Sequence, residues 1–238
     1  MIKKPMSGPI IAISSLFVLP VVVTAMWTGV AVHAQTAPAD QTREFDPVRT
    51  VNIVQEPRHR TVMQDGNLRL LDVQINPGDT TLPHTHDSAI LYTFISNGEG
   101  PLNGRVSSIT TYVEEQYTHR VNNPGPGLFR IIALANYGPA VVGVDAGQID
   151  LTPQLDNEWF RSYRLELAPG ESSASYLHTH PVAIVQVSDG LLHVSRADGI
   201  THELKAMGDW AWREAGVSYQ IHNRSEQPVS VVINEGKR

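Results

Sequence analysis

Apolar and polar residues alternate along much of the chain after residue 60, in short runs bounded by turn-forming residues. Between Leu71 and Ile75 every second residue is apolar, and Tyr163 to Leu167 repeats the pattern. A period of two is typical of a half-buried β-strand, because successive side chains point to opposite faces. No stretch of ten or more residues outside the N-terminal apolar segment shows a period of 3.6. The pattern therefore predicts an all-β protein.

Further β-rich runs follow each of these two strands, and they form two series. Gly, Pro and Asn residues punctuate them, most densely at 122–127. A polar connection separates the two series, which places a domain boundary near residues 145 to 158. The predicted strands are 89–95, 106–113, 117–121, 128–134, 182–187, 191–195, 209–212, 217–221 and 229–233.

The two series are related to each other as an internal repeat. A Pro-Gly turn followed by His-Thr-His occurs twice, at His84 and His86 and again at His178 and His180, with an offset of 94. The segments 117–123 and 217–223 also correspond, with an offset of 100, so that Tyr219 stands where the first half has a histidine. Many short strands and a duplication together indicate two barrels or sandwiches in tandem.

The two His-Thr-His motifs are the strongest chemical signal in the sequence. On a strand, residues i and i+2 share a face, so His84 and His86 are expected to present their imidazoles side by side. Two neutral imidazoles form half of a transition-metal site, and a neighbouring strand can supply the rest. The alternative is a hydrogen-bonded polar cluster without metal.

The N-terminal segment has the layout of a secretory signal peptide. Lys3 and Lys4 precede an uncharged apolar run at 9–32, and Val32-His33-Ala34 has small residues at the positions expected for cleavage. We expect cleavage after Ala34 and a periplasmic or secreted product. The alternative is an uncleaved anchor formed by residues 9–32, which is long enough to cross a bilayer.

The charge and the cysteine content of the chain exclude several classes of partner and of chemical site. Cleavage of the signal peptide removes two lysines and changes the formal net charge from −6 to about −8. The chain has no cluster of basic residues that could bind the phosphates of a nucleic acid. We therefore expect no nucleic-acid partner and no stable membrane insertion after cleavage. Cysteine is absent, which excludes disulfides, thiolate ligands and a cysteine nucleophile.

The motifs around the first histidine pair resemble those of the cupin superfamily. Gly78, His84, His86 and Gly98 match its first motif, although Ile90 and Leu91 occupy the two places where Glu is usual. His119 and Asn123 match the second motif, where Glu114 and Gln116 replace the usual Pro and Gly. The resemblance implies a small jelly-roll barrel with a metal held by His84, His86 and His119.

The second half resembles the same family but has lost more of its pattern. Gly170, His178, His180, Gly216 and Asn223 match, whereas Ile184 or Val185 replaces the Glu and Tyr219 replaces the third histidine. The resemblance therefore implies a bicupin, two jelly-roll (cupin) barrels in tandem after a signal peptide. We expect a degenerate second site formed by His178, His180 and Tyr219. The expected ranges are 1–34 for the signal peptide, 35–60 for an extended N-terminal arm, 61–145 for barrel 1 and 158–238 for barrel 2.

By the resemblance, the first barrel binds one divalent transition metal, either Fe, Mn, Zn or Ni. Cupins with three histidines and no Glu include iron enzymes similar to cysteine dioxygenase, so dioxygenase-like chemistry on a small oxygen-bearing substrate is expected, with isomerisation as the next reaction class. The alternatives are a non-catalytic periplasmic protein that binds a small molecule or sugar, and a structural envelope protein. The family also suggests a homodimer. The sequence identifies no catalytic residue beyond the metal ligands.

Overall fold

The computed structural model describes residues 49–143 and 145–238. The predicted signal peptide at 1–34 and residues 35–48 of the predicted arm lie outside this range. The described residues belong to one compact unit. Within that range, none of the helices has the length and apolarity needed to span a membrane.

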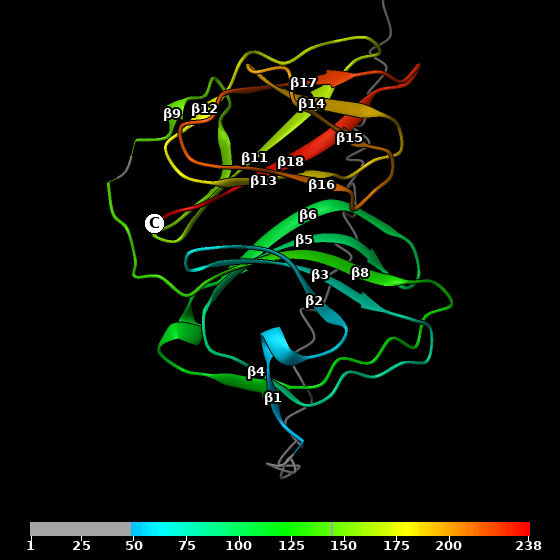
Figure 1. Cartoon of the computed structure of the whole chain (residues 1–238). Coiled ribbons are helices and arrows are strands. Elements are labelled where there is room, and N and C mark those ends of the chain that lie inside the picture. The colour runs from blue at the N-terminus through cyan, green and yellow to red at the C-terminus, as the bar shows by residue number, and fades with distance from the viewer. Residues whose placement is uncertain (1–48, 144) are drawn as a thin grey trace, which may run out of the picture. The chain divides into compact units, whose positions relative to one another are not determined.

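The first barrel consists of two sheets that face each other (Figure 1, cyan to green). The larger sheet is antiparallel and has five strands, in the order β2 (His59–Asp65), β3 (Leu68–Ile75), β8 (Phe129–Asn136), β5 (Ala89–Asn97) and β6 (Pro101–Ile109). The smaller sheet has the order β1 (Val51–Asn52), β4 (His84–His86) and β7 (Tyr117–His119). β1 runs parallel to β4 and forms the edge of this sheet.

The second barrel repeats this architecture (Figure 1, yellow-green to red). Its five-stranded sheet has the order β10 (Pro153–Asp156), β11 (Phe160–Leu167), β18 (Val229–Gly236), β13 (Val182–Gln186) and β16 (Trp210–Arg213). Its other strands are β15 (Thr201–Leu204), β14 (Leu192–Arg196) and β17 (Tyr219–Asn223) in one sheet and β12 (Leu177–His178) with β9 (Gly147–Gln148) in another. The five-stranded sheets of the two barrels correspond in strand order, whereas the remaining strands form one sheet in the first barrel and two in the second.

The all-β bicupin-like prediction is therefore confirmed. The helical elements of the described residues are two short 3-10 helices, η1 (Ile53–Gln55) and η2 (Thr111–Val113). β9 and β10 lie within the stretch 145–158 that the sequence assigns to a connection, and both pair with strands of the second barrel.

Three hydrophobic clusters hold the unit together. One fills the first barrel, one fills the second, and the third lies between the two five-stranded sheets. The third cluster includes Leu91, Phe160 and Trp212. Burial of one such large side chain contributes about 1.5–3 kcal/mol. β5 is buried on both faces, so that some of its residues face the interior of the first barrel and others face the cluster between the barrels.

Asn123, a residue of the second motif, closes the end of the first barrel below the histidines. Its side-chain nitrogen donates to the carbonyls of Ile75 (2.8 Å) and Gly127 (2.8 Å), which joins β3 to the loop before β8. Gly98 allows this approach, because its φ is +86° and a Cβ there would lie 2.2 Å from the Asn123 Oδ1. Asn223 makes the corresponding bonds in the second barrel. The motif Asn is thus structural in both barrels.

Candidate metal centre

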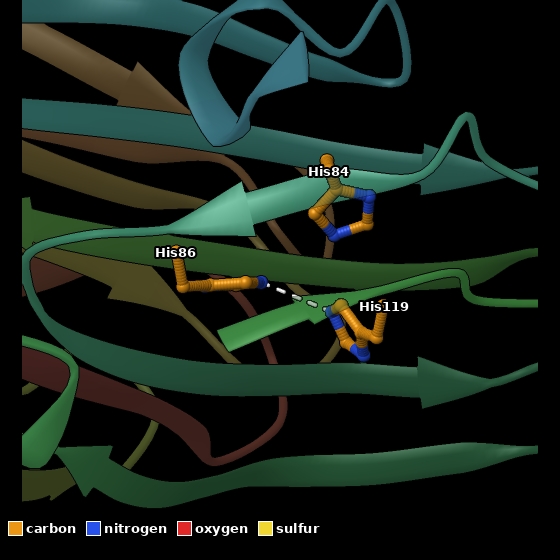
Figure 2. Close-up of side chains that lie close together, drawn as sticks. All are labelled: His84, His86 and His119. Carbon is orange, nitrogen blue, oxygen red and sulfur yellow. Dashed lines mark hydrogen bonds between the residues drawn. The ribbon is translucent and has the colours of Figure 1, made fainter. Parts of the chain in front are cut away.

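The three predicted ligands of the first barrel converge. His84 and His86 lie on one face of β4, and antiparallel pairing with β7 puts His119 opposite His84. One ring nitrogen from each histidine lies within 4.8 Å of those from the other two, and the three rings face a common space (Figure 2). His84 and His86 are buried and His119 is half-buried. The i, i+2 spacing and the strand pairing together create this cluster.

Hydrogen bonds to the backbone and within the cluster orient the histidine rings. The Nδ1 of His84 donates to the Leu82 carbonyl (2.9 Å), which fixes the tautomer, and its Nε2 is buried without a partner. The Nε2 atoms of His86 and His119 are 3.0 Å apart (Figure 2). Two nitrogens bound at about 2.1 Å to one ion at a right angle are separated by about 3 Å. The donor set and its spacing therefore fit a divalent transition ion.

The electrostatics keep these imidazoles neutral. Burial, followed by repulsion from the neighbouring rings when they are charged, lowers the pKa of His86 to about 2. Burial and His84 lower the pKa of His119 to about 4, and burial lowers the pKa of His84. A neutral imidazole is the form that binds a metal, so the three histidines are in the metal-binding protonation state across the physiological pH range.

We expect the metal-free protein to lose stability as the pH falls below about 6.5. The pKa values of His86 and His119 in the folded state lie below that unfolded value, so the unfolded chain binds protons first. Each such histidine then costs about 1.4 kcal/mol per pH unit, which for His119 applies down to a pKa of about 4. Urea unfolding at several pH values tests this slope. A His119→Gln variant should show a shallower loss, and equal slopes would contradict the assignment.

The structure brings a fourth histidine to the cluster, which sequence reasoning missed. His59 is buried at the start of β2, and its ring centroid lies 4.4 Å from that of His84 in an edge-on contact. Burial, together with His84 and His119, lowers its pKa to about 3. Its nitrogens lie outside the group of three that converge within 4.8 Å. No motif spacing links residue 59 to the others, since only the pairing of β2 with β3 places it here.

The position of the missing Glu is occupied by Ile90. Ile90 belongs to the cluster that fills the first barrel, together with the half-buried Tyr92, whose hydroxyl lies 3.5 Å from the Nδ1 of His86. Leu91 belongs instead to the cluster between the barrels. Of the two places considered in the sequence, residue 90 therefore faces the interior and residue 91 does not.

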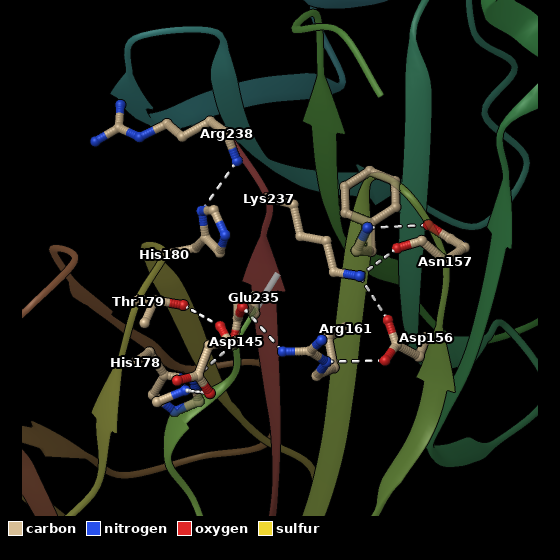
Figure 3. A network of polar contacts seen from close by, with 12 residues as sticks. Asp145, Asp156, Asn157, Arg161, His178, Thr179, His180, Glu235, Lys237 and Arg238 are labelled. Carbon is tan, nitrogen blue, oxygen red and sulfur yellow. Dashed lines mark hydrogen bonds and ion pairs between the residues drawn. The ribbon is translucent and has the colours of Figure 1, made fainter. Parts of the chain in front are cut away.

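The predicted second site is only partly assembled. The Nε2 of His178 lies 2.9 Å from the Tyr219 hydroxyl, and its Nδ1 lies 2.9 Å from the buried Glu235 carboxylate. His180 turns away, and its Nδ1 accepts from the backbone N–H of Arg238 (Figure 3). The prediction that His178, His180 and Tyr219 share one site is wrong for His180, because β12 ends at His178 and the i, i+2 alternation does not continue.

The chain is similar to several known proteins. The chain matches no family model. It is 30% identical over 86 residues to the Beta-alanine degradation protein BauB of Pseudomonas aeruginosa, an alignment that covers 36% of this chain and 90% of BauB. A solved cupin domain from Bordetella pertussis is 25% identical and covers 40% of this chain and all of that one (TM-score 0.33). AerE from Microcystis aeruginosa is 12% identical and covers 77% of this chain and 99% of its own (TM-score 0.50), which is a similarity of fold.

Proposed function

Since the chain belongs to the cupin superfamily, we propose that its first barrel is a metal-dependent enzyme centre held by His84, His86 and His119. The observation that supports this is that three neutral imidazoles, two of them buried, converge without a carboxylate, and that the buried Nε2 of His84 has no hydrogen-bond partner. When bound, a divalent ion supplies Lewis acidity and, for a redox-active metal such as iron, electron transfer with dioxygen. Three neutral ligands leave its full charge available to a substrate oxygen.

The residues behind the histidines position them. Glu56 is buried, and its carboxylate accepts from the backbone N–H groups of Leu82 (3.2 Å) and Arg58 (2.5 Å). This carboxylate holds the turn whose Leu82 carbonyl orients His84. Such outer partners fix the direction of a ligand's lone pair, and their loss typically weakens metal binding 10- to 100-fold.

Tyrosines flank the cluster on the side where it approaches solvent. The Tyr112 ring, on η2, lies 5.0 Å from that of His86, and the Tyr117 ring lies 5.1 Å from that of His119. These two tyrosines stack on each other at 5.7 Å, and Tyr117 is 39% exposed. We propose that a small oxygen-bearing substrate enters here, with its apolar part against the rings. The proposed reaction class is oxidation by dioxygen, with isomerisation as the alternative.

The experiment that tests this function loads the purified chain with Fe(II), Mn(II), Zn(II) or Ni(II) separately. Oxygen consumption is then followed with a panel of small hydroxy and keto compounds. Turnover that depends on one of the ions supports the proposal. Ligand-induced stabilisation without turnover for any ion would instead favour the non-catalytic binding protein.

An Ile90→Glu variant is expected to bind Mn(II) more tightly, by about tenfold or 1.4 kcal/mol. The carboxylate would reach the interior at the position where cupins usually have Glu, and carboxylate ligands favour harder ions such as Mn(II). It should also reduce turnover, because it competes with substrate. Metal competition assays and oxygen consumption on the same preparations measure both effects.

The matched control for that variant is Leu91→Glu. Leu91 is fully buried between the barrels, so its replacement should destabilise the chain without changing its metal preference. If Ile90→Glu leaves the preference for Mn(II) unchanged, residue 90 does not face the ion.

We further propose that this centre operates outside the cytoplasm, on the basis of the signal-peptide pattern that ends at Ala34. The mature protein is then expected to begin at Gln35. N-terminal sequencing of the protein recovered from the periplasm of an expressing host checks this. Recovery of the chain with Met1, bound to membranes, would contradict it.

A further inference from the structure

The ring of His59 lies as close to that of His84 as the rings of the three converging histidines lie to one another, although His59 belongs to the opposite sheet. Its centroid is 4.4 Å from that of His84, and the three converging rings are spaced at 4.6 to 5.2 Å. His59 is 4% exposed. It therefore lies beside the centre, on the side of β2, and is as deeply buried as His86.

Two ring nitrogens in this contact have no hydrogen-bond partner among the described residues. They are the Nδ1 of His59 and the Nε2 of His84, and both are buried. Leaving one buried polar atom unpaired costs about 1–3 kcal/mol. Two such atoms on contacting imidazoles are an expensive arrangement for a purely structural cluster. A single ion bound to both nitrogens would satisfy both.

The second barrel provides an internal comparison for this position. β3 and β11 align end to end with an offset of 92, so Leu165 corresponds to Val73, the cross-strand partner of His59. Continuing the β10–β11 register by two residues beyond the pair Pro153 and Tyr163 places Leu151 opposite Leu165. Leu151 packs against the apolar core of that barrel. The barrel with tyrosine in place of the third histidine thus also has leucine in place of His59.

We propose that His59 is the fourth imidazole ligand of the first-barrel metal centre, an inference that rests on the function proposed above. Since its nitrogens lie outside the 4.8 Å group, the ring must shift toward the ion when the ion binds. It would supply from β2 the ligand that Ile90 no longer provides from β5. Four imidazoles favour Fe, Ni, Zn or Cu over ions that prefer oxygen ligands, such as Mg and Mn.

The test counts coordinated imidazoles in the full chain loaded with Co(II). Each ligating histidine gives one strongly shifted, exchangeable ring N–H resonance in the proton spectrum of the paramagnetic protein. We expect four in the wild type and three in His59→Leu, which copies the second barrel. Zn(II) affinity, measured by competition with a chelator, should fall by about tenfold or more in the variant. His202→Leu, which removes an exposed imidazole from β15, should match the wild type in both.

Each outcome decides the inference. Three shifted resonances in the wild type, or an equal count in wild type and His59→Leu, overturns the assignment of His59 and leaves the three-histidine centre standing. No bound Co(II) in the wild type overturns both. If His59→Leu does not fold, the wild-type count still decides, and His59→Gln provides a second, polar replacement.

Discussion

The His119→Ala variant is expected to bind Zn(II) or Fe(II) at least about 100-fold more weakly than the wild type. His119 is the only one of the three converging ligands that comes from β7, and its Nε2 lies 3.0 Å from that of His86. Its removal leaves two converging imidazoles on β4, which are rarely enough to retain an ion against water. Affinity by chelator competition and metal content after gel filtration measure the loss.

The matched control is His222→Ala. His222 is close to the second-motif position of the second barrel, but its Nδ1 lies 2.7 Å from the Ser172 hydroxyl, outside the His178 and Tyr219 pair. The His222→Ala variant should bind as much metal as the wild type. Metal retained by His119→Ala at wild-type affinity would show that the ion, if any, binds elsewhere.

The second large effect is expected for Glu235→Ala, which should lower the free energy of unfolding by about 3–5 kcal/mol. The Glu235 carboxylate is fully buried, 2.9 Å from the Nδ1 of His178 and 3.5 Å from the Arg161 guanidinium (Figure 3). Its removal leaves the buried His178 N–H without this acceptor and weakens the compensation of the Arg161 charge. Asp156, which is 3.0 Å from Arg161, offsets part of the loss.

Urea unfolding measures this effect, and Glu226→Ala is the control. Glu226 is an exposed carboxylate, so its removal should change the free energy of unfolding by no more than about 0.5 kcal/mol. The metal content of Glu235→Ala should equal that of the wild type, because the network belongs to the second barrel. A loss below about 1 kcal/mol, or a fall in metal content, would contradict the structural role assigned to Glu235.

The network gives a structural reason for our expectation that the second barrel binds no ion tightly. Tyr219 stands where the first barrel has His119, and its hydroxyl bonds directly to the Nε2 of His178. Both nitrogens of His178 thus have partners, whereas the Nε2 of His84 in the first barrel has none. The same fold therefore contains one cluster with an unpartnered ring nitrogen, the Nε2 of His84, and one in which both ring nitrogens of His178 are hydrogen-bonded.

The sequence predicted much of the fold because period-two patterns and turn residues act locally. It also predicted the convergence of His84, His86 and His119, since the first two share a strand face and the third follows from the motif resemblance. The alternation rule failed at His180 because the strand ends two residues earlier.

The remaining features depend on contacts between distant segments. His59 joins the cluster only through the pairing of β2 with β3, and Glu235 reaches His178 from the last strand. The sequence also could not show which of Ile90 and Leu91 faces the interior of the first barrel, because β5 is buried on both faces and both residues are apolar.

Elemental analysis of the chain, purified without chelator, tests the central claim most directly. The first-barrel centre predicts about one divalent transition ion per chain in the wild type and almost none in His119→Ala. Wild-type protein that contains no such ion, and takes up none when supplied with Fe(II), Mn(II), Zn(II) or Ni(II), would contradict the account. Two tightly bound ions per chain would contradict the division of roles between the barrels.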